Sequence, residues 1–156
     1  LSAERRAADA LAVGDRVPDV AENEVVGSAP YRISRRSADW RTLVRCQSQY
    51  LVFKDEERTG ADSQMTSLLC ARLKTLGKRV ARKWPELRLR VTEAWDEDGE
   101  HGRGSLHYEG RAADITVSDT DVAKLGQLGQ LAVEVGFDWV YYEDRSHVHV
   151  SVKRTK

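Results

Sequence analysis

Residues 131–152 read Leu-Ala-Val-Glu-Val-Gly-Phe-Asp-Trp-Val-Tyr-Tyr-Glu-Asp-Arg-Ser-His-Val-His-Val-Ser-Val, which predicts the end of a helix followed by two strands. Gly136 ends the helix, because glycine readily adopts the left-handed conformation that closes a helix. Residues 139–143 and 147–153 are rich in β-branched and aromatic side chains, as strands are. Only a short turn separates these two strands, so we expect a hairpin.

Two helices are predicted from apolar residues that recur three and four positions apart and so form one stripe on a helix surface. One begins after a capping box of Ser118 and Asp121 and carries Val122, Leu125, Leu128, Leu131, Ala132 and Val135. The other is capped by Asp62 or Ser63 and stopped by Pro85. Its apolar positions are Met65, Leu69, Leu73, Leu76, Val80 and Trp84.

Four more strands are predicted upstream of the hairpin, at residues 50–53, 87–92, 106–109 and 112–117, with a turn at Gly110 between the last two. Helices and hairpins do not alternate as they do in a parallel sheet. The expected class is therefore α+β, with a mostly antiparallel sheet packed against two helices.

The composition suits one domain of 156 residues with an N-terminal arm. Residues 1–45 are weakly patterned, with a short helix expected at residues 3–13, and residues 46–156 form the ordered domain. Lys plus Arg and Asp plus Glu both number 25, so no net charge favours nucleic acid or an anionic membrane. No apolar run is long enough for a transmembrane segment. We expect a monomer whose signal peptide is absent or removed, and pairing of Cys46 with Cys70 stays open.

Three residues have the ligand types of a zinc site: His107 and Asp114 within residues 105–114, and His149 in a His-Val-His run. Two histidines and a carboxylate hold Zn²⁺ with one position left for water. Glu143 stands where a general base would take the proton of that water. His147, or His101 from the preceding loop, would donate to the developing oxyanion. A purely structural zinc, with His147 as fourth ligand, is the alternative.

A second candidate site consists of carboxylates in two acidic stretches. Ca²⁺ takes six to eight oxygen ligands, and the six side chains are Glu56, Glu57, Asp62, Glu93, Asp96 and Asp98. The stretch at residues 96–100 does not have the spacing of an EF-hand. From residue types and spacing alone, ordinary solvated acidic loops are the better interpretation.

Several tracts resemble the amino-terminal signalling domain of Hedgehog proteins. They are residues 53–62, Phe-Lys-Asp-Glu-Glu-Arg-Thr-Gly-Ala-Asp, residues 91–99, Val-Thr-Glu-Ala-Trp-Asp-Glu-Asp-Gly, and residues 105–114, Ser-Leu-His-Tyr-Glu-Gly-Arg-Ala-Ala-Asp, together with residues 131–143 and 147–149. The resemblance implies a two-layer α+β sandwich, one zinc ion at His107, Asp114 and His149, and two calcium ions at the six carboxylates, which reverses the interpretation of the acidic loops. The 105–114 tract also looks like the signature of D-Ala-D-Ala carboxypeptidases and lysostaphin-type zinc peptidases.

Two functions follow from this resemblance. The first is a secreted or periplasmic zinc peptidase whose calcium site orders the loop that carries His101. The second is a secreted signalling ligand that binds a Patched-like receptor and immunoglobulin- or fibronectin-type co-receptors. The lipidated cysteine and basic cluster at the start of animal ligands have no counterpart here, where only Arg5 and Arg6 stand. The zinc ligands, Glu143, His101 and His147 are all in place, so the sequence favours the peptidase.

Overall fold

The computed structural model describes residues 10–28, 32–54, 60–97, 101–102 and 104–154. Its centre is a six-stranded sheet with the order β1-β7-β8-β6-β5-β3. The strands are β1 (Arg16–Val17), β3 (Leu51–Phe53), β5 (Leu89–Glu93), β6 (Ala112–Val117), β7 (Trp139–Asp144) and β8 (His147–Ser151). All neighbours pair antiparallel except β3 and β5, which are parallel. The predicted α+β class with a mostly antiparallel sheet is confirmed.

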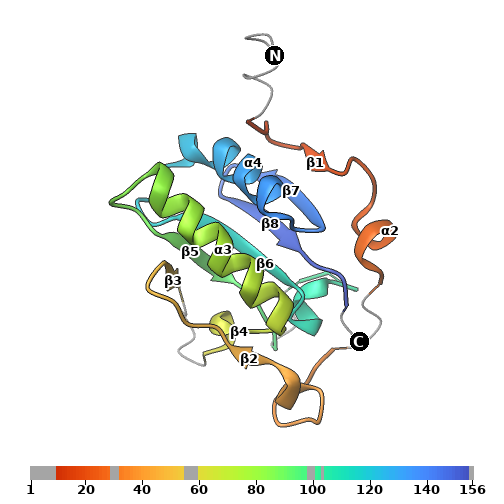
Figure 1. The fold of residues 1–156 in the computed structure, drawn as a ribbon. Helices are drawn as coiled ribbons and strands as arrows, with labels where there is room; N and C mark the ends of the chain where they lie inside the picture. The colour runs from red at the N-terminus through yellow and green to blue at the C-terminus, as the bar shows by residue number, and fades with distance from the viewer. Residues whose placement is uncertain (1–9, 29–31, 55–59, 98–100, 103, 155–156) are drawn as a thin grey trace.

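Helices α3 (Ser67–Lys83) and α4 (Leu125–Val135) cover one face of the sheet, as Figure 1 shows. The core lies between these two layers. It is built from alternate strand positions, because successive side chains of a strand point to opposite faces. Val148, Val150 and Val152 are fully buried, as predicted, and so are Val91 and Ile115. The polar residues that alternate with them lie on the other face of the sheet.

Three predicted elements differ in type or in their first residue. Helix α4 begins at Leu125 without a side-chain cap, and Asp121 caps the 3-10 turn before it instead. Residues 106–109 form a 3-10 helix (Leu106–Glu109) and not a strand, because the Ser105 side chain accepts a hydrogen bond from the His107 backbone N–H and starts a tight turn. Helix α3 begins at Ser67 with Thr66 as its cap, not at Asp62 or Ser63. The chain before it forms a 3-10 turn (Ala61–Ser63) and then β4 (Gln64–Met65).

The remaining short elements surround this core. A two-stranded sheet joins β4 to β2 (Val44–Arg45), and 3-10 helices stand at Trp40–Thr42 and Val122–Lys124. The prediction that Val122 points inward is wrong, because it lies in the exposed 3-10 turn before α4. None of the described helices has the length and apolar character needed to span a membrane.

The N-terminal arm packs along the sheet edge. The expected helix at residues 3–13 falls mostly outside the described residues, and residues 10–13 are not helical. β1 pairs with β7, and α2 (Glu22–Val26) follows it. The Leu11 backbone N–H donates to the Gly126 carbonyl at 3.0 Å. A Cβ atom on Gly126 would lie 2.4 Å from the Leu11 carbonyl oxygen, so only glycine permits this contact.

Cys46 and Cys70 form a disulfide bond that ties the chain near β2 to helix α3. Both cysteines are buried. The sequence left this pairing open. Disulfide bonds persist in oxidising compartments and are uncommon in the cytosol, so the bond is consistent with an extracellular or periplasmic protein.

Reducing this disulfide is expected to lower the free energy of unfolding by about 3 kcal/mol, because the bond constrains the loop between two cysteines that are 24 residues apart. The measurement is urea denaturation with and without reductant. A Cys46→Ser/Cys70→Ser variant serves as the control and should not respond to reductant. A wild-type response below about 1 kcal/mol would contradict a stabilising role for the bond.

Candidate metal centre

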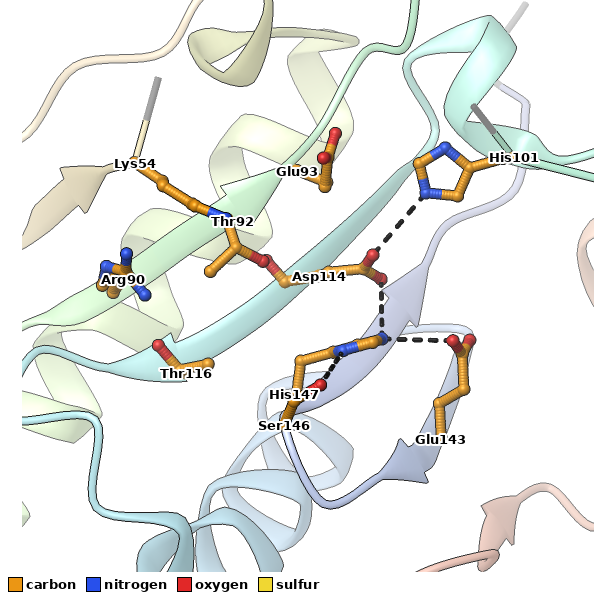
Figure 2. Close-up of a pocket in the computed structure, with 10 residues that line it drawn as sticks. All are labelled: Lys54, Arg90, Thr92, Glu93, His101, Asp114, Thr116, Glu143, Ser146 and His147. Carbon is orange, nitrogen blue, oxygen red and sulfur yellow. Dashed lines mark hydrogen bonds and ion pairs between the residues drawn. The ribbon is translucent and has the colours of Figure 1, made fainter. Parts of the chain in front are cut away.

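Asp114 lies at the middle of a histidine cluster on the sheet face that the helices leave open. It belongs to the central strand β6, and its neighbour β8 carries His147 and His149. His107 reaches the cluster from the 3-10 helix before β6. His101 reaches it from the loop before that helix, and Figure 2 shows its ring facing Asp114. All four histidines of the chain therefore surround one carboxylate.

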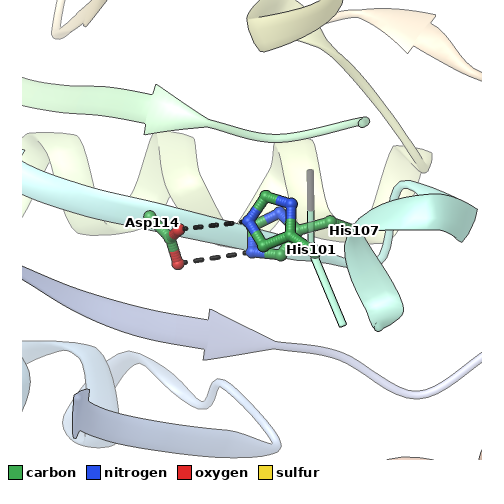
Figure 3. A group of neighbouring side chains, drawn as sticks. All are labelled: His101, His107 and Asp114. Carbon is green, nitrogen blue, oxygen red and sulfur yellow. Dashed lines mark ion pairs between the residues drawn. The ribbon is translucent and has the colours of Figure 1, made fainter. Parts of the chain in front are cut away.

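The shortest distances join Asp114 to two of the predicted zinc ligands. Its Oδ1 atom lies 3.1 Å from His149 Nδ1 and 3.3 Å from His107 Nε2. His101 Nε2 and His147 Nε2 lie further away, each 3.7 Å from a carboxylate oxygen of Asp114. Figure 3 shows the stacked rings of His101 and His107, both joined to Asp114 by ion pairs. The ligand atoms of these three residues lie within 4.8 Å of one another, a group that could hold a metal ion and that does not include His149.

The hydrogen bonds of His107 leave one ring nitrogen available for a metal. Its Nδ1–H donates to the Ala94 carbonyl at 2.8 Å, since a carbonyl oxygen can only accept. This bond fixes the tautomer and leaves the lone pair on Nε2. Nε2 is buried and has no hydrogen-bond partner among the described residues. A buried nitrogen that makes no hydrogen bond and lies 3.3 Å from a carboxylate oxygen, with the opposite ring nitrogen held by a carbonyl, fits a metal ligand.

His149 has a similar arrangement with its nitrogens exchanged, except that its inner nitrogen, Nδ1, forms a hydrogen bond with Asp114 at 3.1 Å. Its Nε2–H donates to Glu22 Oε2 at 2.6 Å, and Nδ1 faces Asp114. A carboxylate behind a histidine is a common outer partner in zinc sites, because it orients the ring and raises its basicity. Glu22 comes from α2 in the N-terminal arm, and the sequence analysis missed it. An isolated glutamate far from the histidines in sequence carries no pattern that would reveal this contact.

The pKa values of Asp114, His149 and His101 are shifted by burial and by the charged groups around them. Burial alone would raise the pKa of Asp114, but the adjacent histidines, led by His107, hold it well below its ordinary value. Burial would lower the pKa of His149, yet hydrogen bonds to Asp114 and Glu22 raise it to about 10. Burial also lowers the pKa of His101, but hydrogen bonds to Asp114 and Asp96 raise it to about 9. Without a metal ion, protons therefore compensate the buried carboxylate.

Glu143 and His147 stand at the rim of the cluster. Glu143 is exposed at the end of β7, and its Oε2 atom lies 3.2 Å from His147 Nε2. Ser146 and Asp144 surround the other ring nitrogen of His147. Glu143, Asp144 and His147 form a second group whose ligand atoms could hold a metal ion. The catalytic roles predicted for Glu143, His147 and His101 stay predictions.

Only half of the predicted calcium ligands lie among the described residues. Asp62 and Asp96 are buried, and Glu93 is partly buried at the end of β5. Glu56, Glu57 and Asp98 lie outside the described residues. Asp96 also accepts hydrogen bonds from the backbone N–H and from Nδ1–H of His101, at 3.1 and 2.7 Å. His101 therefore joins the acidic stretch to the histidine cluster.

Two cavities open beside the cluster and form a cleft across the free face of the sheet. One of about 460 Å³ extends toward β5 and β3, and its walls include Lys54 and Arg90 (Figure 2). The other, of about 380 Å³, extends toward the arm and is bordered by Trp139 and Tyr141. His101 and Glu143 border both cavities. Volumes of this size are typical of sites for small molecules or short peptide segments.

Comparison with known proteins gives a consistent result. Residues 2–151 match the Hedgehog amino-terminal signalling domain family. The chain is 51% identical over 145 residues to the Sonic hedgehog protein of Xenopus laevis. The aligned region covers 92% of this chain and 33% of that protein. It is 51% identical over 138 residues to the Indian hedgehog protein of Gallus gallus, 87% of this chain and 34% of that protein. Identity to the hedgehog protein of Drosophila virilis is 46% over 145 residues, which are 92% of this chain and 30% of that protein. The chain spans about a third of the length of these curated relatives.

Proposed function

Because the chain belongs to the Hedgehog amino-terminal signalling domain family, we propose that it is a secreted signalling ligand that binds its receptor through the cleft at the histidine cluster. The observation that carries this proposal is the match of residues 2–151 to a family described by its signalling role. The relatives are named as hedgehog proteins, and none of the three compared above is named as a peptidase. The buried disulfide supports secretion.

This proposal reverses the preference that the sequence suggested. That preference rested on the missing lipidated cysteine and basic cluster. The chain spans about a third of its relatives, so features missing from this stretch carry no weight. What remains is the candidate metal centre, which a signalling ligand and an enzyme could share.

The metal centre in this proposal is one zinc ion held by His107, Asp114 and His149. The fit rests on His107 Nε2, which is buried without a hydrogen bond among the described residues, and on the outer partners of both histidines, the Ala94 carbonyl and Glu22. Zinc bound by three protein groups keeps a fourth position for water or for a group from a partner. His101, Glu143 and His147 line the cavity beside Asp114 and would contact whatever binds there.

The two proposed kinds of partner would bind at two different sites, the cleft and the acidic stretches. A Patched-like receptor would insert a peptide segment into the cleft. Immunoglobulin- or fibronectin-type co-receptors would bind over the two-calcium site of Glu56, Glu57, Asp62, Glu93, Asp96 and Asp98. The residue types support the second site, because carboxylate oxygens are the ligands that Ca²⁺ prefers.

A zinc-dependent peptidase is the second candidate, and the Glu143–His147 contact favours it. A bound zinc ion would acidify a water molecule. Glu143 would accept the proton of that water, and the imidazolium rings of His147 and His101 would donate hydrogen bonds to the oxyanion of the attacked carbonyl. The cleft extends to both sides of the cluster, as a peptide substrate would require.

One pair of measurements separates the two functions. Binding to a Patched-like ectodomain is measured by surface plasmon resonance before and after zinc removal, and cleavage of a peptide library is measured with the same preparation. The signalling proposal predicts zinc-dependent binding without turnover. Cleavage that is lost in Glu143→Gln, with zinc still bound, would establish the peptidase. Absence of both binding and cleavage would reject the two proposals together.

Replacing Glu22 by Gln is expected to weaken zinc binding by roughly 10- to 100-fold, because the carboxylate orients His149 and raises its basicity. The affinity is measured by competition with a zinc-binding dye. The matched control is Glu24→Gln, since Glu24 lies on the same short helix and is exposed. Equal zinc affinities for the two variants would remove Glu22 from the metal centre.

A further inference from the structure

His101 differs from the other three histidines of the cluster, because it lies outside the helices and strands. No helix or sheet ladder fixes its backbone, so its place at the cleft depends on contacts with other segments. Its ring stacks on that of His107, with the ring centroids 3.9 Å apart, and faces Asp114 (Figure 3). Whatever holds this stretch of chain therefore decides where His101 stands.

Two side chains hold His101, one from each side along the sequence. Asp96 accepts hydrogen bonds from the backbone N–H and the Nδ1–H of His101, at 3.1 and 2.7 Å. From the other side, the Tyr108 hydroxyl donates a hydrogen bond to the His101 carbonyl. Since these bonds hold both the backbone and the ring, the place of His101 follows from the places of Asp96 and Tyr108.

The N-terminal arm contacts the chain beside the first of these supports, Asp96. The Arg35 guanidinium forms a bidentate pair with the carboxylate of Glu97, the next residue after Asp96. Its Nε atom lies 2.7 Å from Oε2, and its Nη2 atom lies 2.8 Å from Oε1. On the other side of Asp96, the Trp95 Nε1–H donates to the Ile33 carbonyl at 3.2 Å. Both sequence neighbours of Asp96 are therefore bonded to the arm.

The same few residues of the arm contact the second support, Tyr108. The Ile33 backbone N–H donates to the Tyr108 carbonyl at 2.9 Å. The Arg32 guanidinium lies over the Tyr108 ring, 4.8 Å from its centroid, at a distance that suits a cation–π contact. Residues 32–35 thus contact the chain on both sides of His101.

The Arg35–Glu97 pair is the strongest of these contacts. The guanidinium also lies over the rings of Trp40 and Trp95, 5.6 and 5.3 Å from their centroids. Only 33% of the Arg35 side chain and 17% of the Glu97 side chain are exposed. A planar guanidinium can form two parallel bonds to a carboxylate and stack on aromatic rings at once, whereas a lysine ammonium cannot form that fork.

We propose that Arg35 is a positioning residue for the cleft, because its pair with Glu97 holds the stretch of chain that presents His101 to the bound partner. This inference rests on the proposed function, in which His101 contacts the partner, and adds the arm residue that sets the place of His101. The arm then acts on two histidines of the cluster, since Glu22 holds His149. The competing explanation is that the pair only fastens the arm to the domain.

The test compares the wild-type chain with Arg35→Lys, which keeps the positive charge and loses the fork. NMR at constant pH, with and without zinc, follows the NOE between the ring protons of His101 and His107 and the hydrogen exchange of the His101 backbone N–H. We expect the variant to lose most of the NOE intensity and to exchange about tenfold or more faster at His101. The matched control is Arg41→Lys, because Arg41 lies in the same part of the arm and is exposed.

A second variant, Glu97→Gln, removes the other half of the pair. It should reproduce the effect of Arg35→Lys, and the double variant should add little, because both substitutions break the same contact. An unchanged NOE and unchanged exchange in both single variants would overturn the positioning role. A rise in exchange that is equal throughout the domain would also overturn it, since that is the result expected if the pair only fastens the arm.

A binding measurement relates the place of His101 to the partner. Arg35→Lys should keep one zinc ion per chain, while its affinity for a Patched-like ectodomain should fall about tenfold. Unchanged affinity in a variant that has lost the NOE would overturn the link between Arg35 and the partner. The NMR signals need neither zinc nor a partner, so the same loss of the NOE supports the positioning role even if the wild type binds no receptor and the proposed function fails.

Discussion

Replacing His107 by Ala is expected to abolish stoichiometric zinc binding and to remove the stabilisation that zinc gives the fold. The substitution deletes the one ring nitrogen of the cluster that is buried without a hydrogen-bond partner among the described residues. A ligand that binds only the folded state stabilises it by about 4 kcal/mol at a thousand times its dissociation constant. We expect a loss on the order of 4 kcal/mol at saturating zinc, measured by chemical denaturation with zinc and with a chelator.

His101→Ala and His147→Ala are the controls for this prediction. Both residues lie 3.7 Å from Asp114 and are proposed to contact the bound partner or substrate rather than the metal ion. Their variants should keep one zinc ion per chain and most of the zinc-dependent stability. His149→Ala should behave like His107→Ala. A chain that loses zinc on replacement of His101 but keeps it on replacement of His149 would assign the ion to the group of His101, His107 and Asp114 instead.

Replacing Arg111 by Met is expected to destabilise the domain by about 3 kcal/mol, because it removes the donors for buried groups of two distant segments. Arg111 is 1% exposed. Its guanidinium donates to the Val26 carbonyl at 2.6 Å and the Ser28 carbonyl at 3.0 Å, and pairs with Glu109 at 3.2 Å. The substitution leaves these acceptors without their charged donor. Urea denaturation measures the loss.

Arg154→Met is the matched control, since Arg154 also contacts Glu109, at 2.6 Å, but its side chain is 58% exposed. Because water reaches the Arg154 end of this pair, its loss should cost less than about 1 kcal/mol. Hydrogen exchange adds a local measurement: the Arg111 variant should lose protection near α2, which Arg111 holds through the Val26 carbonyl. Similar effects of the two substitutions would show that burial of Arg111 is unimportant.

Much of the fold follows from local patterns in the sequence. The apolar stripes of α3 and α4 and the alternation of β7 and β8 predicted their positions within a few residues, because each element buries one face against the same core. Residues 106–109 were misassigned, since four residues between a serine and a glycine suit either a strand or a 3-10 turn. The difference comes from the Ser105 side chain, which closes the turn on the His107 N–H.

The candidate site could likewise be predicted from the sequence only in part. Strand alternation put His147 and His149 on one face, and the structure places both beside Asp114. Glu22, Lys54 and Arg90 could not be assigned from the sequence. Each reaches the cleft because of the order of strands in the sheet or the path of the arm, and no local sequence pattern reveals that order or that path. The parallel pairing of β3 with β5, which places Lys54 beside Arg90, is such a long-range feature.

The most direct test of the central claim is to locate the zinc ion by anomalous diffraction at the zinc absorption edge, using crystals of the zinc-loaded chain. The account predicts one peak bonded to His107 Nε2, an Asp114 carboxylate oxygen and His149 Nδ1, with His149 Nε2 still bonded to Glu22. A peak between Glu143, Asp144 and His147, or the absence of any peak at Asp114, would contradict it.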